Sequence, residues 1–176
     1  MGFPKALLRY REETFLDTLA GLFAARCSPV IVVLGAHAGR IRECALRPAT
    51  FVFNPDFERG MTVSLQCGLR AAPPDTEGVL FTLVDHPAVA PSTIDALLAA
   101  PRALLRVPRL NGRRGHPVWF SRDLIPEFLA LPETGAARDV VRAHTAETEF
   151  LDLDDPGILA DIDDPAAYGR LTGATL

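Results

Sequence analysis

Two kinds of apolar spacing follow one another along the chain. In residues 13–26 (ETFLDTLAGLFAAR), apolar side chains recur three and four positions apart, which predicts an amphipathic helix. In residues 30–35 (VIVVLG), they are consecutive and mostly β-branched, which is typical of a strand buried on both faces of a parallel sheet. A helix followed by a buried strand indicates an α/β protein.

The same two patterns continue to the end of the sequence. A buried strand is predicted over 79–84 and stops at Asp85, and Pro91-Ser92-Thr93 supply capping chemistry for a helix that runs to residue 100. The other predicted elements are helices at 37–46, 61–72, 122–131 and 136–144, strands at 50–53 and 149–152, and two strands joined by a glycine-rich turn within 103–120. This alternation predicts an α/β fold with a mainly parallel sheet, in a single domain over residues 1–176.

The overall composition restricts the class of partner. The 176 residues are 48% apolar and 23% charged, so the chain can bury a core without disulfide or metal staples. Lys and Arg number 18 against 22 Asp and Glu, and the resulting net charge of −4 argues against a nucleic-acid partner. An anionic substrate would need locally placed cations, backbone amides or a metal ion.

Cysteine usage and hydropathy indicate the compartment. Cys27, Cys44 and Cys67 are odd in number and form no CxxC pair, which predicts reduced, mostly buried thiols. The sequence shows neither a secretory-type apolar stretch near its start nor an apolar run long enough to cross a bilayer. We therefore expect a cytoplasmic protein without a membrane partner.

Acidic residues after the third strand and near the C-terminus are candidates for a metal site. Asp85 lies where ligands bind in open α/β sheets, and it either holds Mg²⁺ or caps the following turn. Asp161 and Asp163 lie two positions apart, so both point to the same side of an extended segment. Asp164 is predicted to cap a short helix that begins with Pro165. A solvated acidic tail is the simpler interpretation, and pairing of one carboxylate with Asp85 around a cation is the alternative.

Two segments offer backbone amides to an anion. Lys5 follows Gly2 in the opening loop, and a glycine-containing loop with a lysine suits phosphate, although a lone lysine near a terminus is usually a surface residue. The helix after Gly60 carries Thr62 and Ser64 in its first turn. Its free amides could bind an anion or a base, or these residues serve only to start the helix.

The segment GRRGHPVWF, residues 112–120, combines two arginines with two glycines. Arg113 and Arg114 could bind a phosphate in bidentate fashion, and the glycine backbone would let a flat ligand approach. An exposed hairpin tip and a structural histidine at His116 are the simpler interpretations.

Taken in this order, the segments resemble the MobA-like nucleotidyltransferases, and within them the molybdenum cofactor cytidylyltransferases. The similar segments are MGFPKALL at the start, VVLGA at 32–36, NPDFERGMTVSLQCGLRAA from residue 54, LVDHPAV at 83–89, GRRGHPVWF at 112–120 and DIDDPAAY from residue 161. The GRRGHPV segment is similar to the part of the cytidylyltransferase branch that lies over the pterin substrate.

The resemblance implies roles for particular residues of this sequence. The catalytic residues are Lys5 and Asp85, and Asp85 with Asp163 would hold Mg²⁺. The implied nucleotide-binding residues are Gly2, Lys5, Asn54, Gly60, Ser64 and Asp85. The implied acceptor-binding residues are Arg113, Arg114, Gly115, His116 and Pro117.

The implied reaction is attack by the terminal phosphate of molybdopterin on the α-phosphorus of CTP, with release of pyrophosphate. The substrates are then CTP and the molybdenum cofactor, with a recipient molybdoenzyme as a further partner. The alternatives are GTP or another phosphorylated acceptor on the same fold, or a non-catalytic protein that binds the cofactor or a nucleotide.

The resemblance also implies a Rossmann-like sheet, as in nucleotide-diphospho-sugar transferases, that lacks its usual first strand. Family members begin with a strand and a loop of which MGFPK is the second half, so about 15 residues have no counterpart here. Because that strand is internal to the sheet, two neighbouring strands are expected to have unpaired edges.

Overall fold

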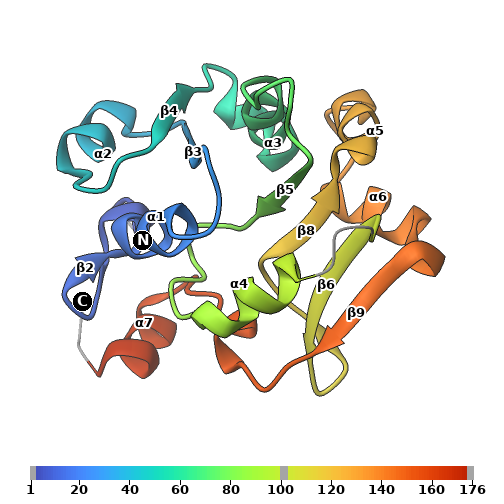
Figure 1. Ribbon diagram of the computed structural model, residues 1–176. Coiled ribbons are helices and arrows are strands. Elements are labelled where there is room, and N and C mark those ends of the chain that lie inside the picture. The colour runs from blue at the N-terminus through green and yellow to red at the C-terminus, as the bar shows by residue number, and fades with distance from the viewer. Residues whose placement is uncertain (1–2, 100–102, 174–176) are drawn as a thin grey trace.

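The structure, a computed structural model, describes residues 3–99 and 103–173 (Figure 1). Its first elements are a 3₁₀ turn η1 (Lys5–Leu7), the antiparallel strands β1 (Arg9–Tyr10) and β2 (Glu13–Thr14), and the helix α1 (Phe15–Ala24). Thr14 caps α1, because its hydroxyl accepts a hydrogen bond of 3.0 Å from the Asp17 N–H. Phe15 and Leu19 are buried on one face of α1, which confirms the predicted amphipathic helix.

A parallel pair of strands follows α1. The pair consists of β3 (Ile31–Leu34) and β4 (Thr50–Phe53), joined through the helix α2 (Ala38–Cys44). After the 3₁₀ turn η2 (Phe57–Arg59), the helix α3 (Met61–Arg70) begins at Gly60, whose φ of 112° is a conformation that side chains rarely adopt. These elements confirm the predicted order of strand, helix, strand and helix in this region.

The larger sheet has five strands. They are β5 (Gly78–Phe81), β6 (Leu105–Leu110), β7 (Arg113–Arg114), β8 (Val118–Ser121) and β9 (Thr148–Asp152). The order is β5-β8-β6-β7, with β9 on β6, and the β6–β9 ladder is parallel whereas the other ladders of this sheet are antiparallel. The predicted α/β class is confirmed, with the antiparallel strands gathered around the glycine-rich turn.

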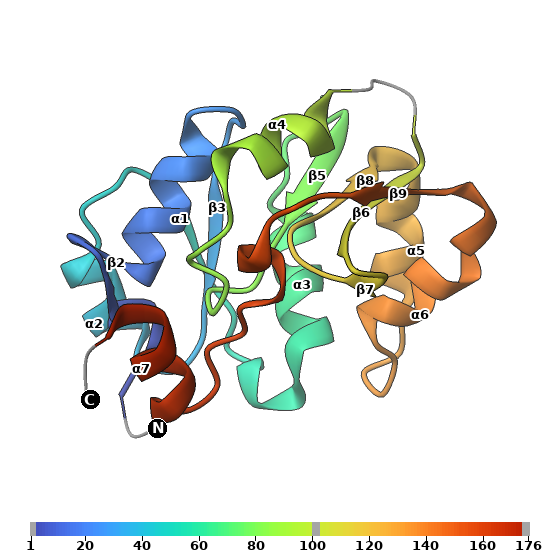
Figure 2. The ribbon, with the colours of Figure 1, turned by 90° about the horizontal axis from the view of Figure 1, so that it is seen from below.

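Helices cover both faces of the strands. The later helical elements are α4 (Pro91–Leu98), η3 (Arg122–Leu124), α5 (Ile125–Ala130), α6 (Ala137–Ala143), η4 (Thr145–Glu147), η5 (Pro156–Leu159) and α7 (Pro165–Thr172). Figure 2 shows α4 on one face and α3, α5 and α6 on the other. Phe120 and Phe128, with ring centroids 4.5 Å apart, lie in the core between β8 and α5. Among the described residues, each helix is too short or too polar to cross a lipid bilayer.

The β3–β4 sheet and the five-stranded sheet do not join each other. Among the described residues, β3 pairs only with β4 and β5 pairs only with β8, so each has one edge without a strand neighbour. A cavity of about 570 Å³ is lined by both of these strands and by α1 and α3, mostly with aliphatic side chains. The strand that the resemblance implies between the two edges has no counterpart in the described part of the chain.

Several predicted elements end earlier in the structure, among them β5 and α4. The strand predicted over 79–84 ends at Phe81, because its partner β8 begins opposite Phe81, at Val118, and the preceding Pro117 has no N–H to extend the ladder. Asp85 therefore lies in the loop beyond β5. The helix α4 ends at Leu98 rather than at residue 100, and residue 100 itself lies outside the described residues.

The predicted cap of α4 is also wrong. Its N-cap residue is Ala90, and no side chain of the helix caps it. Asp155 caps it from a distant part of the chain, since its carboxylate accepts hydrogen bonds from the Ala90 N–H and the Thr93 hydroxyl at 2.9 and 2.6 Å. By contrast, Asp164 caps α7 as predicted, by accepting a hydrogen bond from the Ala167 N–H at 2.6 Å.

Burial differs from the prediction at β3 and at the cysteines. β3 is only half-buried over Ile31–Val33, since the strand lines the cavity. All three thiols are free, as predicted, but Cys44 is exposed, and Cys27 and Cys67 are only partly buried.

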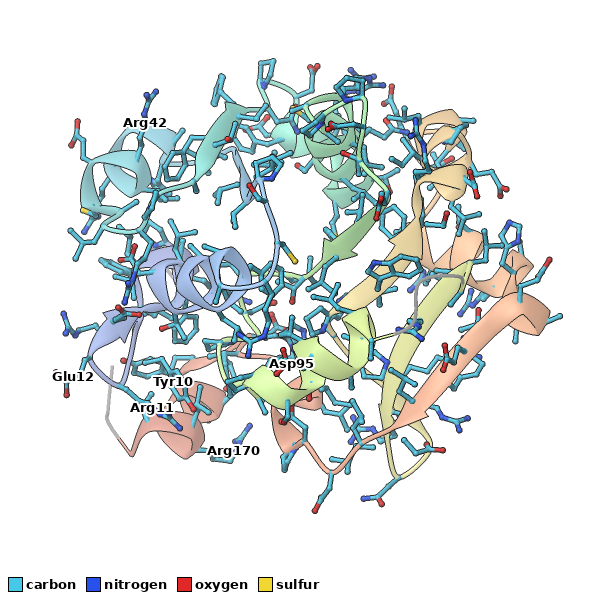
Figure 3. All side chains as sticks on the ribbon, in the orientation of Figure 1. Tyr10, Arg11, Glu12, Arg42, Asp95 and Arg170 are labelled. Atoms are coloured by element: carbon cyan, nitrogen blue, oxygen red, sulfur yellow. The ribbon has the colours of Figure 1, made fainter. Side chains whose placement is uncertain are left out.

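The first and last elements of the chain pack against each other. The ring of Tyr168 in α7 lies 6.1 Å from that of Phe15, and its hydroxyl donates a hydrogen bond of 2.9 Å to the Arg9 carbonyl. Figure 3 labels Tyr10 of the β1–β2 hairpin and Arg170 of α7 at this corner of the molecule. This packing brings the segment before α7 close to η1.

Candidate functional site

Lys5 is the only lysine in the sequence and lies at the start of η1. Its Nζ lies 3.3 Å from Asp85 Oδ2 and also donates a hydrogen bond to Asp163 Oδ1. Burial lowers the pKa of Lys5, but the hydrogen bond to Asp163 and the charge of Asp85 outweigh burial and raise the pKa above its ordinary value. The lysine is therefore a fixed positive charge between two carboxylates that are far apart in sequence.

The two oxygens of Asp85 have different surroundings. Oδ2 accepts the hydrogen bond from Lys5, whereas Oδ1 is buried and has no hydrogen-bond partner among the described residues. No described backbone N–H donates to this side chain, so the structure does not favour the turn cap considered for Asp85. Since buried carboxylate oxygens normally have a partner, Oδ1 is a place where a cation or a hydrogen-bond donor would fit.

Two histidine rings lie next to Asp85. The Nε2 atom of His86 is 3.8 Å from Asp85 Oδ1, and the ring centroids of His86 and His116 are 4.9 Å apart. The Nδ1 atoms of both rings are buried without a partner among the described residues. Burial, and then the charge of His86, lowers the pKa of His116 to about 4, so His116 is neutral at physiological pH.

The segment before α7 adds two carboxylates. The hydrogen bond from Lys5, followed by the interaction with the neighbouring Asp161 carboxyl, lowers the pKa of Asp163. Burial, followed by the charge of Asp85, raises the pKa of Asp161. The end of the acidic tail is thus part of one electrostatic cluster with Asp85, and pairing of one carboxylate with Asp85 around a cation stays a prediction.

One backbone contact fixes this segment in place. The Ile162 N–H donates a hydrogen bond of 3.2 Å to the backbone carbonyl of Asp85. As a result, potential ligand atoms of Asp85, His86 and Asp161 all lie within 4.8 Å of one another. Asp163, for which the resemblance implies a metal-binding role, contacts Lys5.

The 3₁₀ turn η5 packs against the loops that carry these residues. Asp155, which caps α4, also accepts a hydrogen bond of 2.8 Å from the Gly157 N–H. A Cβ at Gly157 would lie only 2.2 Å from the Ala88 carbonyl oxygen, so the two backbones are in close contact. The Ile158 carbonyl accepts a hydrogen bond of 3.0 Å from the His116 N–H. η5 therefore connects the loop after β5 to the glycine-rich turn.

The glycine-rich turn presents its arginines to solvent. Arg113 and Arg114 form β7 and are exposed, and the Arg114 guanidinium lies 4.7 Å from the centre of the Phe150 ring. A Cβ at Gly115 would lie 2.5 Å from the Ile158 carbonyl oxygen. The turn is therefore an exposed hairpin tip, which is the simpler of the two interpretations of this segment. Its base lies against η5, and the His116 ring at this base contacts the His86 ring.

The residues around Asn54 form a separate group. The Asn54 side chain is buried and donates a hydrogen bond of 3.0 Å to Ser64 Oγ, while its own oxygen accepts one from the Asp56 N–H. Ser64 and Lys5 line the same 570 Å³ cavity. Gly60 is exposed at the start of α3. Gly2, the remaining residue with an implied role in nucleotide binding, lies outside the described residues.

Two residues of the site were missed in the sequence. His86 directly follows Asp85, and its burial depends on contact with His116, which the sequence does not show. Asp155 stands in the run DLDDPG, where an aspartate before Pro-Gly indicates a local turn and gives no sign of the contact with α4. The adjacency of His86 to a candidate metal ligand was the only available signal.

The site thus combines a lysine from η1 with carboxylates from the loop after β5 and from the segment before α7, in an α/β fold. Residues 1–148 match the MobA-like NTP transferase domain. The chain therefore belongs to the MobA-like nucleotidyltransferase family, which confirms the resemblance at the level of the family.

Similarity to individual proteins extends over nearly the whole chain. Nicotine blue oxidoreductase of Paenarthrobacter nicotinovorans is 32% identical over 180 residues, which cover 96% of this chain and 87% of that protein. The crystal structure of Rv0371c from Mycobacterium tuberculosis H37Rv has a TM-score of 0.82 at 30% identity and covers 99% of this chain and 91% of that one. A structure of Rv0371c in complex with manganese has a TM-score of 0.80 at 29% identity, over 98% of this chain and 94% of that one.

Proposed function

We propose that this chain transfers the CMP group of CTP to the terminal phosphate of molybdopterin or the molybdenum cofactor. The observation that carries the proposal is the Lys5 ammonium held between Asp85 and Asp163, on the wall of a cavity that it shares with Ser64. Family membership makes nucleotidyl transfer the class of reaction, while the choice of CTP and of a pterin acceptor comes from the resemblance of the GRRGHPV segment.

The proposed step exchanges one phosphoanhydride bond for another. An oxygen of the acceptor phosphate forms a bond to the α-phosphorus of CTP while the bond from that phosphorus to the bridging oxygen breaks. The electron pair of the broken bond leaves on pyrophosphate. Because the attacking phosphate is already an anion at neutral pH, no general base is required, and catalysis depends on positioning and charge neutralisation. Lys5 is proposed to contact the phosphates, and its raised pKa keeps it charged for that purpose.

The carboxylates are proposed to hold a divalent cation, Mg²⁺. Asp85 fits this role because its Oδ1 is buried without a described partner, and Asp163 is proposed as the second carboxylate of the cation site. When bound there, the cation would neutralise charge on the phosphate oxygens. The manganese complex of Rv0371c supports a divalent cation in a protein of similar fold.

The remaining residues are proposed to bind the rest of the two substrates. Gly2, Asn54, Gly60 and Ser64 are proposed for the nucleotide, and Arg113, Arg114, Gly115, His116 and Pro117 for the acceptor. The proposal for the turn is supported by the two exposed guanidiniums of β7, and by the contact between the rings of His116, at the base of the turn, and His86.

The proposal is tested by incubating the full chain with Mg²⁺, the molybdenum cofactor and either CTP or GTP, and by measuring pyrophosphate and the dinucleotide product. Removal of a charged group that contacts the reacting phosphates typically lowers turnover 100-fold or more, so we expect Lys5→Met and Asp85→Asn to do so by about that factor. The control is Asp75→Asn, an exposed carboxylate in the loop before β5, which should stay within about twofold of the wild type. Product from GTP but not from CTP would contradict the choice of nucleotide.

The single lysine allows a second, activity-independent measurement. Acetylation of Lys5, located by peptide mass, should be slowed when CTP is present and unaffected by cytidine alone, if Lys5 contacts the phosphates. Equal acetylation with and without CTP would refute the assignment of Lys5 even if the protein were active.

An oxidoreductase is the second candidate, favoured by the 32% identity to nicotine blue oxidoreductase. The test is oxidation of a reduced nicotinamide by a quinonoid dye in the presence of the chain. Dye reduction without pyrophosphate release would favour this candidate, and binding of the molybdenum cofactor without either reaction would favour a non-catalytic binding protein.

A further inference from the structure

The positive charge of Lys5 is already matched by its neighbours. Its Nζ lies 3.3 Å from Asp85 Oδ2 and also contacts Asp163 Oδ1, so one ammonium faces two carboxylates. A nucleotide brings several further negative charges in its phosphate chain, and a single divalent cation would not neutralise all of them. Binding of that chain therefore requires another positive side chain close to Lys5.

The fold brings the exposed arginine Arg40, on α2, to the opening loop of the chain. Its guanidinium carbon lies 4.7 Å from the centre of the Phe3 ring. Phe3 precedes Lys5 by two residues, so the Cα atoms of Phe3 and Lys5 are at most about 7 Å apart. Arg40 therefore contacts the same short loop that carries the lysine of the site.

Apolar packing holds α2 against this loop. Ala38 and Ile41 of α2 belong to one hydrophobic cluster with Ala6 and Leu7 of η1. The loop between β3 and α2 lines the same 570 Å³ cavity as Lys5. The position of Arg40 relative to Lys5 is thus set by the core of the protein and does not depend on the contact with Phe3 alone.

The guanidinium of Arg40 is held by its face, and its edge is available. Contact with an aromatic ring engages the flat face of a guanidinium and leaves the N–H groups at its edge to bind an anion. Among the described residues, no carboxylate pairs with Arg40, whereas Arg47, which follows the same helix, is bound to Glu13. Such a guanidinium is suited to bidentate binding of a phosphate.

We propose that Arg40 binds the phosphate chain of the nucleotide together with Lys5, at the end of the chain that leaves as pyrophosphate. Lys5 lies beside Asp85, where the transfer is proposed to occur, whereas Arg40 lies outside this group of carboxylates and can take the part of the chain that is not transferred. The inference deepens the proposed function, on which the choice of nucleotide rests. It assigns to Arg40 a role that neither the sequence patterns nor the resemblance implies.

The test is titration calorimetry of the full chain, at a fixed Mg²⁺ concentration, with CTP, cytidine and inorganic tripolyphosphate. Arg40→Gln should raise the dissociation constants of CTP and tripolyphosphate at least about tenfold, because a charge-assisted contact is lost, and should leave that of cytidine unchanged. Arg40→Lys keeps the charge without the planar fork and should raise them only about threefold. Phe3→Leu removes the ring that holds the guanidinium and should also cost about threefold.

The matched control is Arg42→Gln, which removes the same charge from the same helix. Arg42 is exposed, lies about 200° further around α2 than Arg40, and points away from α1 in Figure 3. Its substitution should change binding of both phosphate ligands by less than about twofold. Equal losses in Arg40→Gln and Arg42→Gln would indicate a long-range effect of net charge and would overturn the inference. Binding of both ligands by Arg40→Gln as tightly as by the wild type would overturn it as well.

The binding experiment separates this inference from the proposed function. Binding of tripolyphosphate that depends on Arg40, without pyrophosphate release from CTP, would support the phosphate contact and refute the proposed transfer. Release of pyrophosphate from CTP by Arg40→Gln with the KM of the wild type would do the reverse. Failure of the wild type to bind either tripolyphosphate or CTP would refute both.

Discussion

Removal of the Asp155 carboxylate should destabilise the packing of α4 against η5. This carboxylate accepts three hydrogen bonds, from the Ala90 N–H at 2.9 Å, the Thr93 hydroxyl at 2.6 Å and the Gly157 N–H at 2.8 Å. A hydrogen bond to a charged acceptor contributes about 1.5–3 kcal/mol, so the three together set an upper range of about 4.5–9 kcal/mol. In Asp155→Ala, a water can occupy the space left by the carboxylate and satisfy part of this set. We therefore expect a loss of about 3–5 kcal/mol in the free energy of unfolding.

The assay is urea unfolding followed by far-ultraviolet circular dichroism, with thermal unfolding beside it. At about 2–4 °C per kcal/mol for a chain of this size, the midpoint of thermal unfolding should fall by roughly 10 °C. Asp155→Asn keeps the shape and one acceptor oxygen but turns an amide toward a donor, so it should lose about 1–2 kcal/mol. The adjacent Asp154 is exposed, and Asp154→Ala should stay within about 0.5 kcal/mol of the wild type.

The reasoning would be refuted if Asp155→Ala and Asp154→Ala had the same stability. That result would mean that water replaces the carboxylate completely, and that α4 and η5 are held by apolar packing alone. An unchanged stability in Asp155→Asn together with a large loss in Asp155→Ala would instead assign the effect to shape rather than to charge.

Three further predictions concern the same region and the cavity. The fold lowers the pKa of His116 from 6.5 to about 4, so between these pH values the unfolded chain binds a proton that the native chain does not. The free energy of unfolding of the metal-free protein should therefore fall by about 3 kcal/mol as the pH is lowered from about 6.5 to 4. Urea unfolding of His116→Gln should lack this part of the pH dependence. Gly157→Ala should cost about 2–4 kcal/mol by calorimetry, because its Cβ would lie 2.2 Å from the Ala88 carbonyl oxygen, and an unchanged midpoint would show that η5 can move away. The 570 Å³ cavity with aliphatic walls should bind a fluorescent apolar dye with saturable 1:1 stoichiometry in the folded state, and a lack of fluorescence below the unfolding midpoint would contradict an open cavity.

The helices and strands that local pattern determines could be predicted from the sequence. The spacing of apolar residues identified α1 and α3, and the β-branched run identified β3. The cap of α7 was also predictable, because Asp164 and the Ala167 N–H are three residues apart and the contact is local.

Contacts between distant parts of the chain could not be predicted in this way. Lys5 and Asp163 are 158 positions apart, and Asp155 and Thr93 are 62 apart, so no local pattern links either pair. The apparent capping signal at Thr93 was misleading for this reason, since its hydroxyl is directed to Asp155 and the helix starts without a cap of its own. Sheet order belongs to the same class of information, because the parallel pairing of β9 with β6 depends on which elements cover each face.

The candidate site could be predicted only in part from the sequence. Lys5 and Asp85 were separate candidates there, and the structure places Lys5 Nζ 3.3 Å from Asp85 Oδ2. His86 was missed because its significance comes from burial against His116, a contact between two loops. A buried histidine beside a carboxylate differs chemically from an exposed one, and only the fold decides which of the two a sequence contains.

The part of the chain that follows the family match contributes much of the site. The match covers residues 1–148, whereas Asp155, Asp161 and Asp163 all lie after it and contact the loops that carry Asp85 and Lys5. Asp155 connects α4 with η5, whereas Asp161 and Asp163 place carboxylates beside Asp85 and Lys5. Because loops can change without altering the sheet that they join, the side chains of this last segment can differ between relatives that share the fold. For this chain, the loop after β5 and the segment before α7 therefore form one candidate site, although they are far apart in the sequence.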